Sequence, residues 1–474
     1  MIMYLETRMS RRSFAGLAGK MMLAGAALLA PGTSFAKDAE PETKGEPDLY
    51  AFLFSRSLDQ RDLATDGILR KVMKQGTETA AKNTAIEEIT ILEKLAREHE
   101  LEIPSSFFMA QRTFARSVNP KDYTWAGVFN PTLWRDEVNV TVDNTLCKLL
   151  QTLELKHLAA RGVKALDGMV LVPAGSFVKG SGFAEARYFE ALTDSSIPAE
   201  WKLPHPNNPK EIPYYDKRGY IAESPRRDIQ VLRSFWIDVL EVTNGDYAKY
   251  CKETNTTKAV VTKDMPKRRG VIGIGYEWDD DMTPGNGRDG KPIKNYPFPF
   301  ASAVAAQAFA SHYGKRLPTG EEWELVARGK GGRLWPWGNL PDYKRGWFVE
   351  AHGYGGAPEP KEEHLSPVGR YPSGASPYGA LDMAGNISEL TSSVYRAALT
   401  GNWDDPQDTQ AKTQEIPGTA TLKGGGGWSF GKNLSENRCA RGAPTLVYGG
   451  YKLGFRCAMD IPPELQYIER PMMK

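Results

Sequence analysis

Four consecutive glycines, Gly424 to Gly427, lie between Lys423 and Trp428. Glycine has no side chain to bury, so such a run marks a place where the backbone needs unusual dihedral angles or where another segment approaches it closely. From Tyr451 to Ala458 the side chains alternate as in a β-strand. This alternation places Leu453, Phe455 and Cys457 on one face and Lys452, Gly454 and Arg456 on the other. The sequence therefore predicts a loop followed by a final strand.

The composition is that of a globular protein. At 474 residues, with 41% hydrophobic and 25% charged residues, the chain is long enough for two domains. Residues 1–36 carry four basic and one acidic side chain, which leaves 56 basic and 57 acidic side chains in the remainder. Because this balance is nearly neutral, it gives no electrostatic basis for nucleic-acid binding.

The first 36 residues are typical of a twin-arginine export signal. Arg11 and Arg12 precede an apolar run, Met21 to Ala30, that is too short to span a bilayer, and Ser34 to Ala36 supply small side chains for cleavage. A chance arginine pair before a signal anchor is the alternative. We expect a periplasmic or otherwise exported mature protein without a membrane span.

The rest of the chain divides by composition. Residues 37–47 are polar with two prolines and predict a flexible leader. Apolar residues at helical spacing predict a small helical region over residues 48–165. The main domain is expected over 166–462, and 463–474 form a C-terminal tail.

Several helix ends are predicted from capping residues. In the helical region, Thr84 with Glu87 fits a capping box, and Asn144 fits the cap of a second helix that ends at Gly162. In the main domain, helices are expected to begin after Thr243, Ser302 and Thr319, of which the last fits a capping box with Glu322. Strands are expected within Gly168 to Phe177 and Phe235 to Val239.

Short sequence blocks of the main domain occur in one fixed order: Gly168-Met-Val-Leu-Val-Pro-Ala-Gly-Ser-Phe, Phe235-Trp-Ile-Asp with Glu241-Val-Thr-Asn, Gly314-Lys-Arg-Leu-Pro-Thr-Gly-Glu-Glu-Trp-Glu, Trp335-Pro-Trp-Gly-Asn, Asp382-Met-Ala-Gly-Asn, and a closing set of Lys423-Gly-Gly, Arg438-Cys-Ala-Arg and Leu453-Gly-Phe-Arg-Cys-Ala. Together they resemble the formylglycine-generating enzyme, or sulfatase-modifying factor, family. The resemblance implies a loop-rich α+β domain of the elaborated C-type-lectin-like kind.

The resemblance also bears on copper. Catalytic members of this family hold copper(I) with two cysteines that lie just after the Lys-Gly-Gly turn, and Ser429 and Leu434 occupy those two positions here. A hydroxyl and an isobutyl group do not replace thiolates as ligands of a soft metal ion. We therefore expect neither copper binding nor formylglycine formation.

Calcium binding is implied by the same resemblance. The family's calcium loop uses a side-chain oxygen, two main-chain carbonyls and a glutamate, which correspond here to Asp382, Gly385, Ile387 and Glu389. Hard oxygen ligands of this kind suit Ca²⁺. The alternative is a turn in which the two carboxylates accept from backbone amides without metal. A second family calcium site is expected to be lost, because Gly346 and Pro360 fall where side-chain oxygens are needed.

Cysteines and histidines leave several possibilities open. Cys147, Cys251, Cys439 and Cys457 allow two disulfides in three pairings, with a buried free thiol as the alternative for Cys147. The resemblance places Ala310 and Ala327 at the positions of the family's disulfide partners for Cys439 and Cys457, which implies that those bridges are lost. None of the six histidines occurs in an HxxxH or HxH pair, so the sequence contains no local histidine motif for a metal ion. Whether iron binds is left open, and the related sulfoxide synthases, which use a histidine-bound iron, are disfavoured.

Each of two features of the closing stretch could either bind a ligand or have a structural role. Arg438 and Arg441 could hold a substrate carboxylate or form structural ion pairs. Trp428 and Ser429 beside the glycines could line a cleft for an extended peptide, or form a packing turn.

Three functions remain open. The first is a non-catalytic binding or structural component of a cell-envelope complex, with a protein or peptide partner. The second is a periplasmic maturation oxidase similar to the pyoverdine-maturation protein of the same fold family. The third is a formylglycine-generating oxidase with unconventional ligands.

Export through the twin-arginine translocase is tested by changing both Arg11 and Arg12 to Lys. This receptor reads guanidinium groups and not charge alone, so the variant should accumulate in the cytoplasm. The measurement is the periplasmic yield by fractionation. An unchanged yield in the double variant would contradict this route.

Overall fold

The computed structural model describes residues 77–125, 128–129, 131–180, 227–256, 292–299, 301–340, 342–348, 365–400, 412–415, 417–425, 443–446 and 453–466. The chain divides into two units, Met1–Asp48 and Leu49–Lys474, and all described residues belong to the second. The predicted signal peptide and leader therefore lie outside them. None of the helices described is long and apolar enough to cross a membrane.

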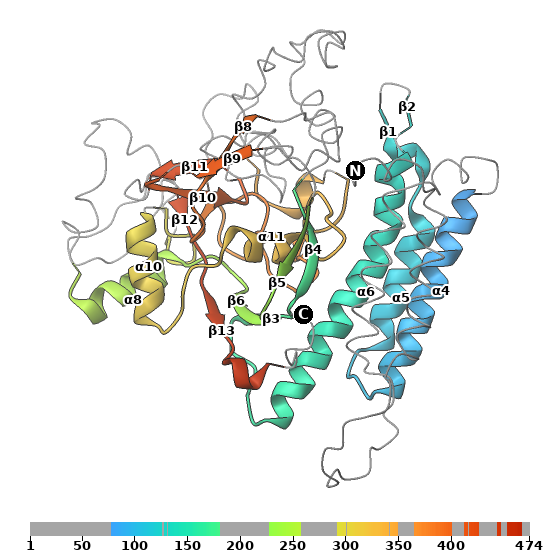
Figure 1. Ribbon diagram of the computed structural model, residues 1–474, viewed down its shortest axis with the longest axis horizontal. Coiled ribbons are helices and arrows are strands. Elements are labelled where there is room, and N and C mark those ends of the chain that lie inside the picture. Colours follow the sequence, from blue (N-terminus) through green and yellow to red (C-terminus); the bar gives the residue numbers. More distant parts are fainter. Residues whose placement is uncertain are drawn as a thin grey trace, which may run out of the picture. The chain divides into compact units, whose positions relative to one another are not determined.

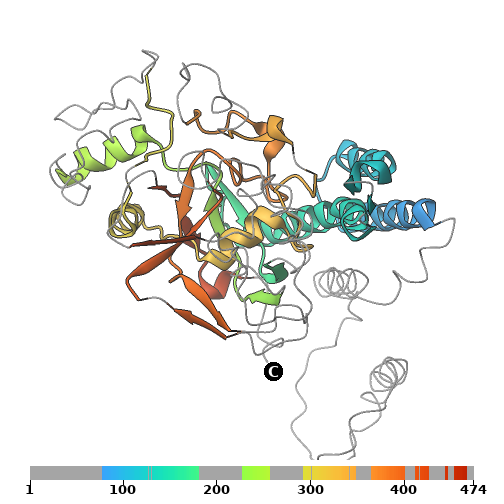
Figure 2. The same ribbon diagram turned by 90° about the horizontal axis from the view of Figure 1, so that it is seen from above.

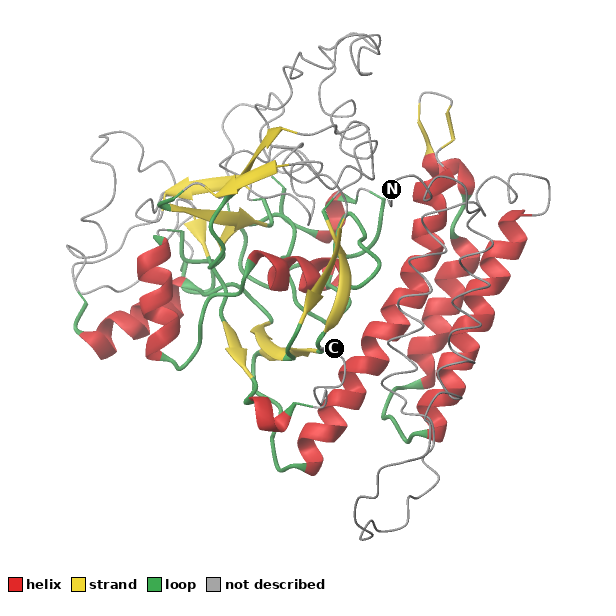
Figure 3. Cartoon of the chain, in the orientation of Figure 1, coloured by secondary structure: helices red, strands yellow, loops and turns green. Residues whose placement is uncertain are grey.

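Three helices come first and pack side by side, as Figures 1 and 3 show: α4 (Thr77–Glu98), α5 (Ser105–Ser117) and α6 (Pro131–Ala160). A short 3₁₀ turn η1 (Pro120–Tyr123) and the strand pair β1 (Thr124–Trp125) and β2 (Val128–Phe129) connect α5 to α6. Ile89 and Leu92 of α4, Phe108 of α5 and Leu146 of α6 are buried in the core that these helices share. The helical region is thus an amphipathic bundle.

Two predicted helix caps in this region are wrong. Thr84 lies inside α4 and Asn144 lies inside α6, so neither begins a helix. Each helix extends further towards its N-terminus because burial of an apolar face outweighs a local capping preference. The predicted end is confirmed: α6 stops at Ala160, and Gly162 takes a left-handed φ of 78° while its N–H donates to the Ala159 carbonyl.

The main domain contains short strands in several small sheets. Their bounds are β3 (Met169–Val172), β4 (Gly175–Lys179), β5 (Arg227–Val231), β6 (Phe235–Asp238), β7 (Ser388–Leu390), β8 (Arg396–Thr400), β9 (Lys412–Glu415), β10 (Thr419–Lys423), β11 (Ala443–Leu446), β12 (Leu453–Gly454) and β13 (Ala458–Asp460). One sheet has the order β11-β10-β7-β12, a second has β13-β6-β3, and β4-β5 and β8-β9 pair separately. Within the first sheet, β12 runs parallel to β7 and the other pairs are antiparallel.

Short helices complete the domain: α8 (Asn244–Thr254), α10 (Ala303–His312), α11 (Gly320–Arg328) and the 3₁₀ turns η5 (Tyr343–Arg345), η6 (Pro372–Gly374) and η8 (Pro463–Leu465). The caps predicted here are confirmed. Thr243 and Thr319 each form a capping box, and the Ser302 hydroxyl accepts from the Ala305 N–H. The predicted α+β, loop-rich fold class is confirmed.

The single final strand predicted over residues 451–458 is wrong. The chain pairs with β7 as β12, leaves that sheet at Phe455 to Cys457, and joins the other sheet as β13. Within the described residues 453–458, side chains of both predicted faces are buried, including that of Arg456. The strand breaks because this arginine turns inward to a carboxylate in the core.

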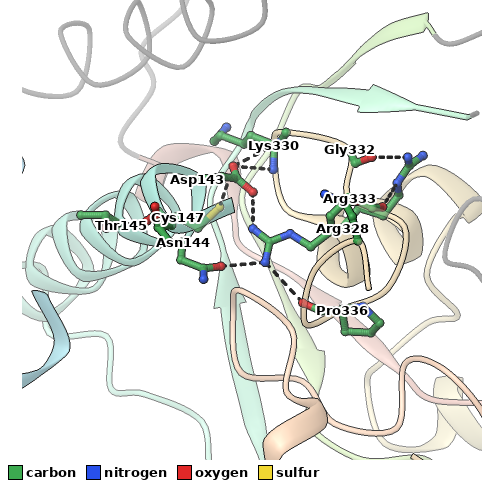
Figure 4. A network of polar contacts seen from close by, with 12 residues as sticks. Asp143, Asn144, Thr145, Cys147, Arg328, Lys330, Gly332, Arg333 and Pro336 are labelled. Atoms are coloured by element: carbon green, nitrogen blue, oxygen red, sulfur yellow. Dashed lines mark hydrogen bonds and ion pairs between the residues drawn. The ribbon is translucent and has the colours of Figure 1, made fainter. Parts of the chain in front are cut away.

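Helix α6 is attached to the main domain by polar contacts (Figure 4), and Figures 1 and 2 both place it between the other two helices and the strands. Asp143 Oδ1 accepts hydrogen bonds of 3.1 Å from the N–H groups of Lys330 and Gly331. The Asp143 carboxylate also pairs with Arg333. At Gly329, whose φ is 64°, a Cβ would lie 2.5 Å from Asp143 Oδ2, so only glycine leaves room for this carboxylate.

Neighbouring positions of α6 extend this contact along the helix. Arg333 Nη1 donates to Asn144 Oδ1 over 2.7 Å, and Gln151 Nε2 donates to the Leu171 carbonyl over 2.8 Å. Glu137, which is 3% exposed, accepts a 2.5 Å hydrogen bond from the Asn339 N–H. Buried polar groups of this kind define a single docking geometry because each has a specific partner.

The Glu137 contact predicts a pH dependence. Burial raises the pKa of Glu137 to about 7, although the Asn339 hydrogen bond and the Arg333 charge oppose the rise. The pKa of Glu137 in the folded state is above its unfolded value of about 4.5, so the buried neutral carboxyl stabilises the fold fully below about pH 4.5. This stabilisation of the folded state is lost as pH rises through about 7. The loss should approach about 3 kcal/mol.

The Glu137→Gln variant keeps the acceptor oxygen but cannot ionise. Denaturant unfolding between pH 5 and pH 8 should therefore show a smaller decrease in unfolding free energy for this variant than for wild type. Parallel pH profiles for the two proteins would contradict an ionising role for Glu137.

Candidate functional site

The loop predicted to bind calcium is tight and buried. It runs from Asp382 to β7, and both Asp382 and Asn386 have left-handed φ values, 57° and 56°. Gly385 has a φ of 93°, and a Cβ there would lie 2.5 Å from the Trp347 carbonyl oxygen. The Asn386 N–H donates to that same carbonyl over 3.0 Å. These backbone conformations bend the chain so that Asp382 and Glu389 reach one buried cluster.

Glu389 is fully buried in the centre of the four-stranded sheet. Its two carboxylate oxygens accept from Arg456, Oε1 from Nη2 over 2.6 Å and Oε2 from Nε over 2.7 Å. Trp323 Nε1 also donates to Oε2 over 2.9 Å. This two-pronged pair matches the planar guanidinium to the planar carboxylate.

Arg456 connects several segments besides β7. Its Nη1 donates to the carbonyl oxygens of Asp238 and Val239, and its Nη2 donates to that of Leu381. The side chain has no exposed surface, and the carboxylates around it raise its pKa further against the effect of burial. Arg456 is therefore a permanent buried cation.

Two more carboxyl groups face this cation. Asp382 Oδ2 accepts a 2.6 Å hydrogen bond from the Gly369 N–H, and the Asp382 carboxyl also contacts that of Glu241. Burial first, and then the Asp382 charge, raises the pKa of Glu241 well above its usual value. Burial likewise raises the pKa of Asp382, opposed by the Gly369 hydrogen bond and by Arg456.

The resulting charge balance defines what the cluster can hold. It contains three carboxyl groups, from Glu241, Asp382 and Glu389, and one guanidinium, from Arg456. Uncompensated buried negative charge is costly, so the cluster must retain a proton or a further cation. Asp382, Glu389 and the carbonyls of Gly385 and Ile387 would be the oxygen ligands of that cation.

The donor types suit calcium, but the Glu389 oxygens already accept from Arg456 and Trp323. No group of three or more His, Cys, Asp or Glu side chains within the described part of the chain could hold a metal ion. The predicted calcium loop has only two carboxylate ligands, and its other two ligands are main-chain carbonyls, so it is not a group of this kind. Calcium at this loop therefore stays a prediction.

The glycine run begins beside the same cluster. Gly424 and Gly425 have φ values of 85° and 58°, and the Gly385 N–H donates to the Gly424 carbonyl. A Cβ at Gly424 would lie 3.1 Å from the ring of Trp323. Unusual backbone angles are confirmed at both glycines, and close approach is confirmed at Gly424. Immediately before it, Lys423 Nζ is buried and donates to Glu324 Oε2 over 2.7 Å.

Several residues predicted for sites lie outside the described residues. These are Trp428, Ser429, Leu434, Arg438, Cys439, Arg441 and Pro360. Gly346 is described, and a Cβ there would lie 2.7 Å from the Ala384 carbonyl oxygen, so the position is packed against backbone.

The three cysteines that the structure describes are buried free thiols: Cys147, Cys251 and Cys457. Cys457 packs in the same hydrophobic cluster as Ala310, which is one of the two alanines that stand where the family has a disulfide partner. Burial raises the pKa of Cys147 to about 12 and that of Cys251 to about 11. Such thiols stay protonated and are poor nucleophiles and metal ligands.

Sequence comparison assigns the domain. The sulfatase-modifying factor enzyme 1-like domain, as a family, matches residues 155–461 of this chain. The chain belongs to this family. The match starts inside α6, eleven residues before the boundary expected at 166.

Individual relatives differ in what their names report. The "Inactive C-alpha-formylglycine-generating enzyme 2" of Bos taurus is 31% identical over 256 residues, which are 48% of this chain and 82% of that protein. The "Formylglycine-generating enzyme" of Mycobacterium tuberculosis is 32% identical over 290 residues, which are 51% of this chain and 93% of that protein. Family membership is therefore compatible with either catalytic status.

A solved structure, that of PvdO from Pseudomonas aeruginosa, resembles 62% of this chain and 94% of its own chain. The TM-score is 0.39 and the sequence identity is 19%. A similarity of this size supports no transfer of function.

Sequence reasoning found Asp382 and Glu389 but missed the groups that surround them. Glu241 stands in a block quoted for its family resemblance, and the strand pattern places Arg456 on the face opposite to Leu453 and Phe455. The one available signal was a charged residue within a run that is otherwise apolar, Leu453 to Ala458. A charge in such a run indicates a buried partner, but its position along the chain does not reveal which carboxylate it meets.

Calcium binding predicts a chelator-sensitive stability. A ligand that binds only the folded state stabilises it by about 2.7 kcal/mol at 100 times its Kd. Removal of calcium with EGTA should therefore lower the Tm of wild type, whereas the Asp382→Ala variant should be less stable and indifferent to EGTA. Thermal unfolding with and without added calcium measures both effects.

The choice of variant matters because Glu389→Ala would also leave Arg456 buried and unpaired, at a cost of about 3–5 kcal/mol without any metal. Asp122→Ala, at an exposed position of η1, is the matched control and should respond to EGTA as wild type does. Equal responses of wild type and Asp382→Ala would show that the loop is a turn without calcium.

Proposed function

We propose that this chain is an exported, non-catalytic member of its family that serves as a binding or structural component of a cell-envelope complex. The observation that carries the proposal is the pair of side chains at the family's copper positions, Ser429 and Leu434. Neither side chain can supply a thiolate, and copper(I) requires soft ligands.

The described cysteines do not fit copper either. Cys147 packs in a different hydrophobic cluster from Cys251 and Cys457, so the three thiols do not form one ligand set. Burial raises the pKa of each thiol, which disfavours the thiolate form that binds copper. The described thiols therefore do not support the family's copper chemistry.

One of the named relatives supports such a loss of activity. The Bos taurus relative is named as an inactive formylglycine-generating enzyme, so the domain occurs in a protein named as inactive. The sequence features that support export are the twin-arginine pattern and the cleavage site within residues 1–36. Calcium, if bound at the Asp382 loop, would have a structural role, since it would neutralise buried carboxylates.

Copper binding and peptide oxidation test the proposal. Purified wild type, incubated with copper(I), oxygen and a cysteine-containing sulfatase peptide, should retain no stoichiometric copper and form no formylglycine. Metal analysis measures the copper, and mass spectrometry measures the loss of sulfur that accompanies aldehyde formation. Conversion by wild type would contradict the proposal and favour an oxidase with unconventional ligands, in line with the name of the Mycobacterium tuberculosis relative.

A gain-of-ligand variant provides the matched control. Changing both Ser429→Cys and Leu434→Cys restores the thiol pair that the family resemblance implies. This double variant should bind one copper(I), whereas Ser429→Cys alone should bind it much more weakly because one thiolate leaves the ion under-coordinated. If the double variant binds no copper, the alignment of these two positions with the family's cysteines is wrong.

A further inference from the structure

A pocket of about 470 Å³ opens where β6, α8 and α10 meet. Its walls come from the loop before β3, the turn 238–243 that joins β6 to α8, the first turns of α8 and the end of α10. This volume is in the range of sites for small molecules. Glu241, which belongs to the carboxyl cluster around Arg456, lines the pocket, whereas Asp382 and Glu389 are not among its described lining residues.

The charged side chains that face the pocket are Asp167, Asp238 and Asp246 against Lys249 and Lys315, because the carboxyl of Glu241 is buried in the cluster around Arg456. Lys315 is already neutralised, because its Nζ lies 2.6 Å from Asp238 Oδ1. Asp246 Oδ2 accepts hydrogen bonds from the N–H and the hydroxyl of Thr243 at the N-terminal cap of α8, and both of these donors are uncharged. Asp167, in the loop before β3, is exposed.

The other basic side chain of the pocket, Lys249, lies against an aromatic ring. Lys249 Nζ lies 5.7 Å from the centre of the Tyr313 ring and 3.8 Å from Glu253 Oε1. The Tyr313 hydroxyl donates to Glu253 over 2.9 Å, which fixes the ring, and Phe309 packs against its edge. The Lys249 side chain is 68% exposed, so an ammonium group rests on this ring without being held there by burial.

We propose that this pocket binds a ligand with a primary ammonium group on an apolar stem, which displaces Lys249 from the Tyr313 ring. Carboxylates at Asp167 and Asp246 supply the opposite charge, and the rings of Phe309 and Tyr313 supply an apolar surface. Two sources carry this chemistry, a free alkylamine and the lysine side chain of a peptide.

Isothermal titration calorimetry of the full-length protein tests the proposal. The probes are n-pentylamine, the peptide acetyl-Gly-Lys-Gly-amide, and n-pentanol as a neutral control of similar shape. Low ionic strength is needed, because exposed charges are screened within about 10 Å at 0.1 M salt. Both amines, or one of them, should bind with saturation while the alcohol should not. Tighter binding of the peptide identifies a lysine side chain as the natural ligand, and tighter binding of pentylamine identifies a free amine.

Two variants should shift the affinity in opposite directions. Asp167→Asn should weaken amine binding about threefold, because an exposed ion pair contributes less than about 1 kcal/mol. Lys249→Gln should strengthen it by a similar factor, since the internal competitor is gone. Asp122→Asn, an exposed change outside the pocket, should leave the affinity unchanged.

Three outcomes would overturn the proposal. The first is the absence of saturable binding of both amines to wild type. The second is equal binding of n-pentanol. The third is weaker binding by Lys249→Gln, which would show that this lysine attracts the ligand and does not compete with it.

Discussion

The buried ion pair between Arg456 and Glu389 is the contact on which the main domain depends. One guanidinium binds both oxygens of a carboxylate in β7 and donates to carbonyls at the end of β6 and at Leu381. It therefore joins the two largest sheets at the point where the chain passes from β12 to β13. A charge with no water around it must keep its partner, so this pair restricts the domain to one arrangement.

A second polar contact makes the helical region part of the same structure. Asp143 and Glu137 of α6 accept hydrogen bonds from backbone N–H groups of the loop that follows α11, where glycines leave space for the carboxylates. The family match begins within α6, which agrees with this attachment. The helices are thus docked by specific hydrogen bonds as well as by their apolar core.

These contacts are separate in sequence from the positions that the family uses for copper. Glu389 lies on β7, Trp323 on α11 and Arg456 between β12 and β13, whereas Ser429 and Leu434 follow the glycine run and lie outside the described residues. A scaffold held by such contacts does not by itself fix the catalytic status. The buried carboxylates of the Asp382 loop add a need for positive charge that is independent of copper.

The sequence by itself determined the family, the fold class and the caps at Thr243, Ser302 and Thr319. Each of these depends on neighbours within a few residues or on blocks in a fixed order. Only the tertiary structure decided that Thr84 and Asn144 lie inside helices, that the last strand divides between two sheets, and that Glu241 and Arg456 share the cluster with the Asp382 loop. These outcomes depend on burial and on charges that meet from distant segments, and the order of residues along a chain does not specify which distant groups come into contact.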